Sequence, residues 1–387
     1  MNPKIYSKKN NIIFDVDSST VAGGLFEFGY DQKGNCINVR ELSSVRKNIT
    51  NGTQYSFEEY WRRTQQIFTE VVEETHLQSL IPVENVYCNV SAPWSSAQKR
   101  EVIYTKKKPF VLTKELADKL IEKEVGSSLK KNLDYHKHDV VLIDRKTIAV
   151  YGNGYPARNP IGKEMSDVKI DSLITVMSEG TKNTFDHIIE QSFHRGPIFT
   201  SNIFIAYHDI QKSLPDYNDS IVIDVAGEMT EVMIVKKDHL ELIGTFPCGI
   251  NAVIRETARV LDINISKTRK HISLLYAGSL GEDYGGQVQK ALKQSYQIWL
   301  REFYNFCDDS SKQGLLPNTI ILKTYADVMS WFESLLLGSD ELSEHIHARA
   351  SIELVHLHAK RKQEKISLDI FDPELRVIAH TIALGNL

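Results

Sequence analysis

The sequence has no long apolar run, few cysteines and no excess of positive charge. No stretch approaches the roughly 18 unbroken apolar residues that span a bilayer, and the basic segment 1–11 lacks the apolar core of a secretory signal. The net charge of −4 argues against a protein that coats nucleic acid, because such proteins are normally basic. We therefore expect a cytoplasmic protein that binds no nucleic acid and does not insert into a membrane directly.

The cysteines are far apart, and no two of them have the spacing of a metal-binding or redox pair. They are Cys36, Cys88, Cys248 and Cys307. This usage predicts free thiols in a reducing compartment, with each cysteine serving as a small core side chain.

The 387 residues exceed the size of one ordinary core, so two or more domains are expected. One pattern occurs twice: an apolar strand ends in an aspartate, turns through small or polar residues and returns as a second strand. The two aspartates are Asp15 and Asp224, which lie 209 positions apart. Each hairpin would therefore begin one half of the molecule.

Two lobes that face each other through such hairpins would form a cleft able to hold a triphosphate. Backbone amides of the turns would cradle the phosphate oxygens, and the carboxylates of Asp15 and Asp224 would hold Mg²⁺ through water. The alternative is that both residues are only turn-forming acids at strand ends.

The two hairpins resemble the phosphate loops of actin-like ATPases, with residues 15–20 similar to the first loop and residues 224–231 similar to the second. Within that superfamily the sequence resembles the FtsA/PilM branch. Residues 246–249 are similar to the connection that follows the second hairpin there. Residues 153–163 are similar to the end of the SHS2 module, a small inserted subdomain.

The resemblance implies an α/β chain with the two-lobed actin-like (ribonuclease H-like) ATPase fold and a small α+β SHS2 insert. Residues 1–85 and 167–215 would form the first lobe, residues 86–166 the insert, and residues 216–387 the second lobe. It also implies ATP and Mg²⁺ as cofactors, with Asp15 and Asp224 holding the metal. The implied cofactor-binding residues are Asp15, Ser18, Ser19, Thr20, Asp224, Gly227 and Thr230.

Three departures from the family pattern weaken the prediction of an ATPase. Asp17 stands where the first loop normally has a glycine, and a carboxylate beside a polyanion is unfavourable. The second loop keeps only Gly227 and adds Glu228, whose charge would point at the phosphates unless its side chain turned outward. Residues 323–327 replace the glycine pair that normally admits adenosine. We therefore expect at most a weak ATPase.

For function, the resemblance implies a scaffold that docks the cytoplasmic tails of inner-membrane proteins and is recruited to the membrane face by them. In PilM-like proteins the process is pilus assembly, and in FtsA-like proteins it is cell division. Self-association is a second implied contact. Exposed aromatic residues would anchor a tail, and Trp94 and Tyr155 are the candidates for that role; the alternative for both is ordinary packing inside the protein. The alternative is a small-molecule kinase with Asp17 or Glu228 as its general base.

Four further local patterns predict structure or contacts. Residues 56–59 form a capping box that predicts a helix. Residues 140–144 and 147–151 predict a hairpin. Lys106, Lys107 and Lys108 could touch anionic lipid or an acidic partner, although a short lysine run more often forms a solvated loop. Residues 375–384 alternate in the manner of a strand or a short packing element and lack the features of a membrane-targeting helix.

Overall fold

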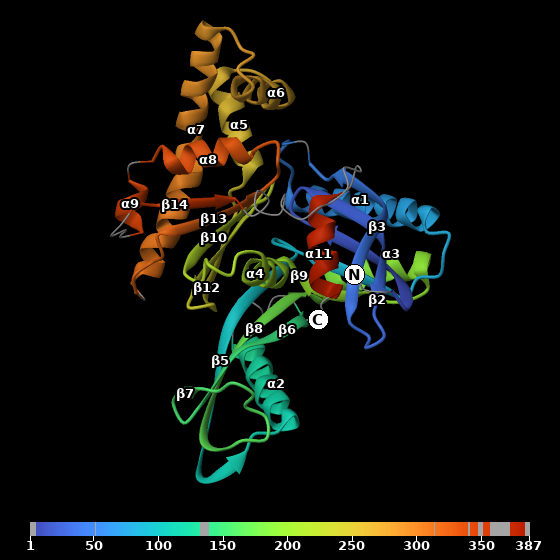
Figure 1. Ribbon diagram of the computed structural model, residues 1–387. Coiled ribbons are helices and arrows are strands. Elements are labelled where there is room, and N and C mark those ends of the chain that lie inside the picture. The colour runs from blue at the N-terminus through green and yellow to red at the C-terminus, as the bar shows by residue number, and fades with distance from the viewer. Residues whose placement is uncertain are drawn as a thin grey trace.

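The computed structural model describes residues 5–50, 52–131, 139–312, 314–339, 341–346, 351–356 and 372–383. Its described strands form three sheets, two of five strands and one of four. Figure 1 shows two lobes side by side and a smaller insert that projects away from both. Within the described residues, every helix is too short or too polar to cross a membrane.

The first lobe is built on a mixed sheet in the order β3-β2-β1-β4-β9. The strands are β1 (Ser7–Val16), β2 (Thr20–Tyr30), β3 (Cys36–Asn48), β4 (Asn85–Val90) and β9 (Ile198–Ser201). The central strand β1 pairs antiparallel with β2 and parallel with β4.

Successive side chains of β1 point to opposite faces of the sheet. Because Ile13 and Phe14 are both apolar and buried, both faces are covered by helices. Phe14 packs in a core with residues of α1 (Phe57–Gln78) and α3 (Glu179–Phe193). Ile13 packs in another core, with residues of α4 (Asn202–Ser213) and α11 (Pro373–Ala383).

The helix start that the capping box at residues 56–59 predicts is confirmed. The hydroxyl of Ser56 accepts a hydrogen bond from the backbone N–H of Glu59 at 3.2 Å, which satisfies a donor at the start of α1.

The second lobe repeats the same strand arrangement, in the order β12-β11-β10-β13-β14. The strands are β10 (Ser220–Val225), β11 (Thr230–Lys236), β12 (His239–Phe246), β13 (Thr319–Thr324) and β14 (Glu353–His356). Here β10 pairs antiparallel with β11 and parallel with β13, as β1 does with its neighbours. The repeated hairpin expected from the sequence is confirmed.

Five helices complete the second lobe in the described part of the chain. They are α5 (Ile250–Leu261), α6 (Ile265–Tyr276), α7 (Glu282–Ser311), α8 (Met329–Leu337) and α9 (Leu342–His345). Trp299 and Phe303 on α7 are buried against Trp331 and Phe332 of α8 in the core of this lobe.

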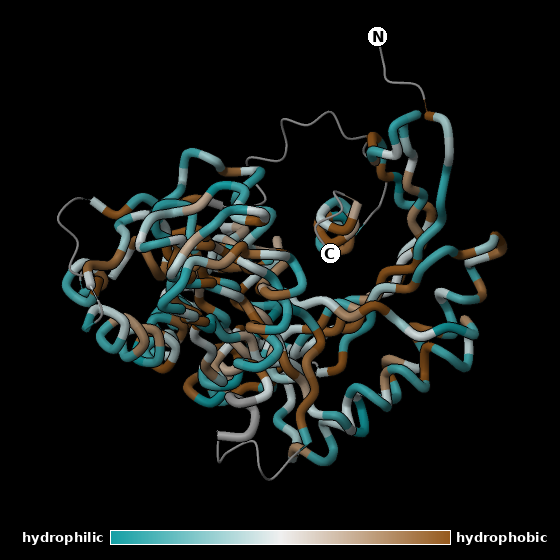
Figure 2. The backbone as a smooth tube through the Cα atoms, turned by 90° about the horizontal axis from the view of Figure 1, so that it is seen from below, coloured by the Kyte–Doolittle hydropathy of each residue, from teal (hydrophilic) through white to brown (hydrophobic). Residues whose placement is uncertain are grey.

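The two lobes share one hydrophobic core. Ile13 and Phe26 of the first sheet belong to the same buried cluster as Val222 and Met233 of the second. Helix α4 contributes Phe204 to that cluster. Figure 2 shows hydrophobic segments of the backbone in the interior of the molecule.

The insert is a sheet in the order β5-β8-β6-β7 with one helix packed on it. Its elements are β5 (Ser95–Val111), α2 (Lys114–Lys131), β6 (Val140–Gly152), β7 (Tyr155–Pro156) and β8 (Glu164–Ser178). The predicted hairpin within residues 140–151 is wrong, because β6 is one strand. Two register shifts against β8 flank the polar pair Arg145 and Lys146, and no turn interrupts the strand.

The predicted boundaries also change. The insert sheet spans residues 95–178 instead of 86–166, since β4 belongs to the first sheet and β8 to the insert. The second lobe does not extend to the end of the described chain, because α11 packs against β1, β2 and β3 of the first lobe. Of the two alternatives predicted for residues 375–384, the strand is wrong and the packing element is present, as helix α11 over the described residues up to Ala383. Leu375, Ile378 and Ile382 are buried at the three- and four-residue spacing of a helix face.

Candidate functional site

The two aspartates that head the hairpins lie on one shared cavity between the lobes. Asp15 ends β1 and Asp224 ends β10, and both line a cavity of about 20 Å³. Asp17, Lys323 and Glu374 line it as well. The facing arrangement that the sequence predicted is therefore present in the structure.

The carboxylate of Asp17 occupies the first turn from within. Its Oδ1 accepts hydrogen bonds from the backbone N–H groups of Ser19 at 2.5 Å and Thr20 at 2.8 Å. Its Oδ2 accepts from the hydroxyls of Thr20 at 2.8 Å and Tyr325 at 2.6 Å. These amides are the donors expected to cradle a phosphate, so the chain supplies its own anion to them.

The second turn presses directly against the first. The backbone N–H of Glu228 donates to Ser18 Oγ at 3.0 Å. A Cβ added to Gly227 would lie 2.1 Å from Ser19 Cβ, so only glycine fits this contact. Together the two turns close the space in which phosphates would lie.

The side chain of Glu228 turns away from the cavity, the orientation that the sequence left open. Its Oε2 accepts from Arg255 Nη2 at 2.8 Å, and its Oε1 accepts from Asn251 Nδ2 at 2.9 Å. Glu228 and Asp17, the two candidate general bases, are therefore both engaged by hydrogen-bond donors.

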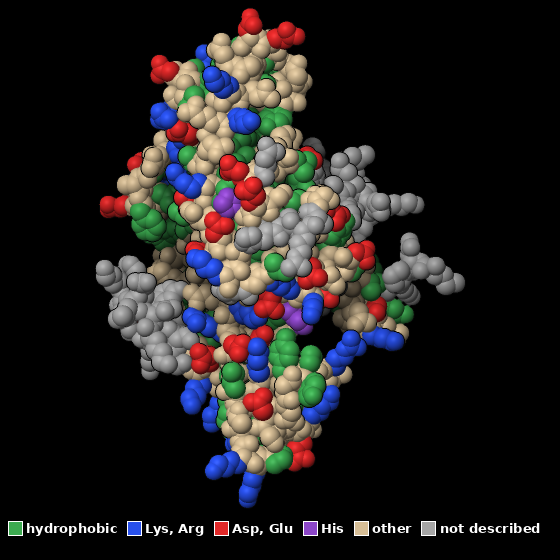
Figure 3. All heavy atoms as spheres, turned by 90° about the vertical axis from the view of Figure 1, so that its left-hand side faces the viewer, with side chains coloured by type: hydrophobic (Ala, Val, Ile, Leu, Met, Phe, Trp, Pro, Cys, Tyr) green, Lys and Arg blue, Asp and Glu red, His purple; other side chains and the backbone are tan. Residues whose placement is uncertain are grey.

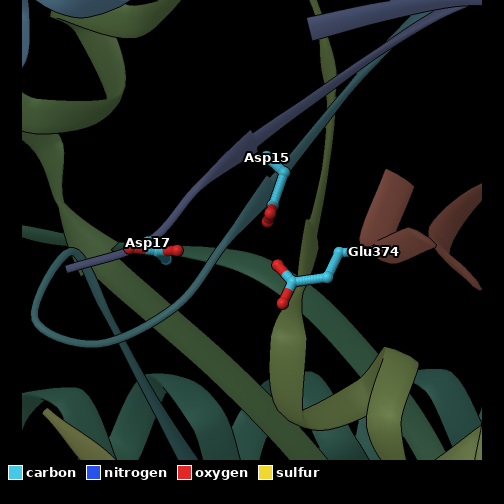
Figure 4. A group of neighbouring side chains, drawn as sticks. All are labelled: Asp15, Asp17 and Glu374. Atoms are coloured by element: carbon cyan, nitrogen blue, oxygen red, sulfur yellow. The ribbon is translucent and has the colours of Figure 1, made fainter. Parts of the chain in front are cut away.

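The guanidinium of Arg46 lies beside Asp15, one of the two predicted metal ligands. Among the described residues, Asp15, Asp17 and Glu374 place carboxylate oxygens within 4.8 Å of one another (Figure 4). Arg46 Nη2 lies 3.4 Å from oxygens of both Asp15 and Glu374. Arg46 Nε donates to Asp372 at 2.6 Å. Arg46 thus brings a fixed positive charge to this group of acids.

Lys323 supplies the cation on the side of the second lobe. Its ammonium donates to Asp224 Oδ2 at 2.5 Å and to Asn202 Oδ1 at 3.0 Å. Burial lowers the pKa of Lys323, but the neighbouring carboxylates, Asp224 first, more than offset this and raise its net pKa. Lys323 therefore stays charged and pairs with the second candidate metal ligand.

Several carboxylates around the cavity have raised pKa values. Burial raises the pKa of Glu231 to about 7, and the charge of Asp224 adds to the shift. Burial likewise raises the pKa of Glu374 to about 7, against the opposing effect of Arg46. Burial also raises the pKa of Asp15. A further anion in this cavity would meet strong repulsion.

The residues present do not fit Mg²⁺-ATP. A cavity of about 20 Å³ has room for about one water molecule, whereas small-ligand pockets measure several hundred Å³. Asp17 takes the turn amides, Arg46 pairs with the predicted metal ligand Asp15, and Tyr325 donates to Asp17. The large residues that replace the glycine pair close the cavity, as the sequence suggested.

The seven predicted cofactor-binding residues have three different fates. Asp15 and Asp224 line the cavity, whereas Ser18, Ser19, Thr20 and Gly227 make contacts within and between the two turns. Thr230 lies in the core of the second lobe, where its hydroxyl donates to Cys248 O at 2.6 Å and accepts from Trp299 Nε1 at 2.9 Å.

Of the two aromatic candidates for partner contacts, only one is exposed. Trp94 is buried, stacks on Tyr60 and donates from its indole N–H to Asp17 O at 2.9 Å, so it has the packing role that the sequence left as the alternative. Tyr155 is 76% exposed. Only Tyr155 remains available to a partner.

Two five-stranded sheets of matching order, facing across a cavity headed by two aspartates, with an α+β insert in the first lobe, define the actin-like ATPase fold. In solved structures, a chain of the "PilM-PilN type IV pilus biogenesis complex" superposes with a TM-score of 0.63 and 11% identity, over 97% of this chain and 98% of that chain. That likeness over nearly the whole length shows the fold.

Weaker structural similarities were also found. The ethanolamine utilization protein EutJ from Carboxydothermus hydrogenoformans aligns at TM-score 0.41 and 11% identity, over 93% of this chain and 88% of that one. The ROK hexokinase from Thermus thermophilus aligns at TM-score 0.39 and 11% identity, over 97% and 98%. No protein-family model matches the sequence, and no curated protein matches it.

Proposed function

We propose that this chain is an actin-like scaffold that docks the cytoplasmic tail of a membrane protein, in pilus assembly or in cell division, without a requirement for nucleotide. The observation that carries the proposal is the cavity between the lobes, which the chain fills with its own charges. Asp17 takes the turn amides, and Arg46 and Lys323 pair with the aspartates.

Direct contacts between the lobes support a platform whose shape does not depend on a ligand. Tyr325 of the second lobe reaches Asp17 of the first at 2.6 Å. On the far side of the turns, Asn251 Nδ2 donates to Thr50 Oγ1 at 3.0 Å and Arg255 Nη1 donates to Gly52 O at 3.1 Å. These bonds do in this chain what a bound nucleotide would otherwise do, which is to tie the two lobes together.

The insert is the proposed docking element. The fold is shared with PilM, a protein solved in complex with PilN, and this favours pilus assembly over cell division as the process. Tyr155 on the insert is exposed enough to anchor a tail. The proposal therefore places the partner's tail at the insert and leaves the cavity between the lobes closed.

The test is capture of tail peptides by the full chain, with and without Mg²⁺-ATP. The probes are synthetic peptides that copy cytoplasmic tails of the membrane proteins encoded beside this chain. We expect one peptide to bind with the same affinity in both conditions. Tyr155→Ala should weaken binding by more than ~2 kcal/mol if Tyr155 is an anchor. Phe57→Ala is the matched control, because Phe57 is another exposed aromatic, 73% exposed on α1.

Two results would contradict the scaffold. The first is calorimetric binding of Mg²⁺-ATP at micromolar concentration together with phosphoryl transfer to a small molecule, which would favour the kinase alternative. The second is a tail affinity that appears only in the presence of nucleotide. Equal loss of binding in the Tyr155 and Phe57 variants would show that the docking site lies elsewhere.

A further inference from the structure

The insert has a charge opposite to that of the rest of the molecule. Residues 95–178 carry 16 Lys and Arg residues and 11 Asp and Glu residues, a net charge of +5 in a chain of net charge −4. Figure 3 shows Lys and Arg side chains around the narrow lower end of the molecule, where the insert projects. An anionic surface would therefore attract this end and repel the lobes.

The end of the insert that lies farthest from the lobes can be identified from strand register. Strands β5 and β8 are antiparallel, with Ser95 opposite Met177 at one end and Val111 opposite Glu164 at the other. Met177 packs in the core of the first lobe, so the pair of Val111 and Glu164 marks the far end. We call residues 106–111 and 158–163 the insert apex.

Hydrogen bonds hold the two segments of the insert apex side by side. The backbone N–H of Leu112 donates to Lys163 O at 3.0 Å, and the N–H of Gly162 donates to Leu112 O at 2.8 Å. Lys106 begins the first segment, and its ammonium lies over the ring of Tyr104, 5.4 Å from the ring centre. The apex is thus a built structure with fixed neighbours.

The insert apex combines exposed basic and apolar side chains. The basic residues are Lys106, Lys107, Lys108, Arg158 and Lys163, and each is exposed. Within the described part of the chain, no carboxylate forms an ion pair with any of them. Val111 and Ile161 beside them are 49% and 52% exposed. The neighbouring Glu164 is also exposed and reduces the local positive charge.

We infer that the insert apex docks on an anionic phospholipid surface. Lysines beside exposed aliphatic side chains suit the boundary between head groups and acyl chains, where charge and apolar contact act together. The narrow, convex end of the molecule favours a lipid surface over an acidic peptide, since peptides bind in grooves. Docking there would hold the insert next to the place where a membrane protein's tail leaves the bilayer.

The test uses the full chain and two kinds of vesicle, one of phosphatidylcholine and one that also contains phosphatidylglycerol, in a co-sedimentation assay without any tail peptide. We expect binding only to the vesicles with phosphatidylglycerol, and weaker binding at higher salt. Neutralisation of one basic residue near such a surface lowers affinity about fivefold. The variant K106Q/K107Q/K108Q should therefore partition about 100-fold less.

The matched control is K267Q/K290Q/K293Q, which removes the same charge from exposed lysines of the second lobe and should bind as the wild type does. Ile161→Ser tests the apolar contribution and should weaken binding at every salt concentration. Equal binding to both vesicles, or equal loss in the two lysine variants, would overturn the inference. If the apex variant instead lost only the tail peptide, the apex would be a protein interface, and the proposed scaffold would stand without the lipid contact.

Discussion

At the residue scale, the buried carboxylate of Glu231 makes the stability of the folded protein depend on pH. It is buried beside Asp224, and Asn202 Nδ2 donates to it at 2.8 Å. Burial raises its pKa to about 7, far above the usual value of a glutamate. The folded state therefore binds a proton at Glu231 that the unfolded state has already released near neutral pH.

We therefore predict that the protonation of Glu231 sets part of the pH dependence of unfolding. Because the folded pKa is raised, the stabilisation from Glu231 is complete below about pH 4.5 and is lost as the pH rises through about 7. Glu231→Gln should remove that loss, so that unfolding free energy at pH 8 rises relative to the wild type by up to about 3 kcal/mol. Urea unfolding at pH 5 and pH 8 measures the difference.

Glu282→Gln is the control, because Glu282 is exposed at the start of α7. It should leave the pH dependence of the wild type unchanged. If Glu231→Gln and the wild type lost stability in parallel between pH 5 and pH 8, the protonation of Glu231 would not explain the pH dependence.

At the element scale, Arg46 on β3 is one of the residues that fasten α11 to the first lobe, beside Glu41 on the same strand. Arg46 on β3 donates to Asp372, which precedes α11, and lies 3.4 Å from Glu374 in its first turn. The hydroxyl of Thr20 accepts from the same guanidinium at 2.6 Å. Arg46 therefore joins the end of the chain to the first phosphate-type turn.

The prediction is that Arg46→Met destabilises the protein by about 3–5 kcal/mol, because it leaves Asp15, Asp372 and Glu374 buried without their counter-charge. Hydrogen exchange in residues 373–383 should become faster, since α11 loses its anchor. Both quantities can be measured on the same samples by urea unfolding and by mass spectrometry.

Arg40→Met is a matched control on the same strand. Arg40 is 60% exposed and lies 3.4 Å from Glu27, a surface pair worth at most about 1 kcal/mol. It should change stability little and leave α11 protected. A loss of similar size in both variants would mean that β3 itself, and not the link to α11, is the sensitive element.

The elements that sequence predicted best are those defined by local patterns. The two hairpins and the helix at Ser56 depend on residues close together in the chain, and each is present in the structure. The contacts of Arg46 with Glu374 could not be predicted, since 328 positions separate them and neither belongs to a motif.

The features that the sequence left undecided have a physical cause as well. The residues next to Trp94 in the sequence give no sign that its indole N–H reaches a buried carbonyl, because that partner, Asp17 O, belongs to a distant turn. Residues 375–384 carry apolar side chains at spacings that fit a strand and a helix equally well. Packing against the first sheet decided for the helix.

On the scale of the whole molecule, the shared core makes the two lobes one folding unit. Val222 and Met233 of the second sheet are buried with Ile13 and Phe26 of the first, and α4 lies in the same cluster. Each lobe also has a core of its own, but an interface between independent domains is more polar than this shared apolar cluster. Here, unfolding one lobe would expose core residues of the other.

We therefore predict that both lobes unfold in one transition, which tryptophan fluorescence can follow lobe by lobe. Trp61 and Trp94 lie in the first lobe, and Trp299 and Trp331 lie in the second. The variant W299F/W331F therefore reports on the first lobe, and W61F/W94F reports on the second.

In both reporter variants, Val222→Ala in the shared core should destabilise the protein by about 1–3 kcal/mol and lower the denaturation midpoint of both signals together. Leu116→Ala, in the separate core of the insert, is the control. If Val222→Ala shifted only the second-lobe signal, the lobes would unfold independently, and the cavity between them would open without loss of either core.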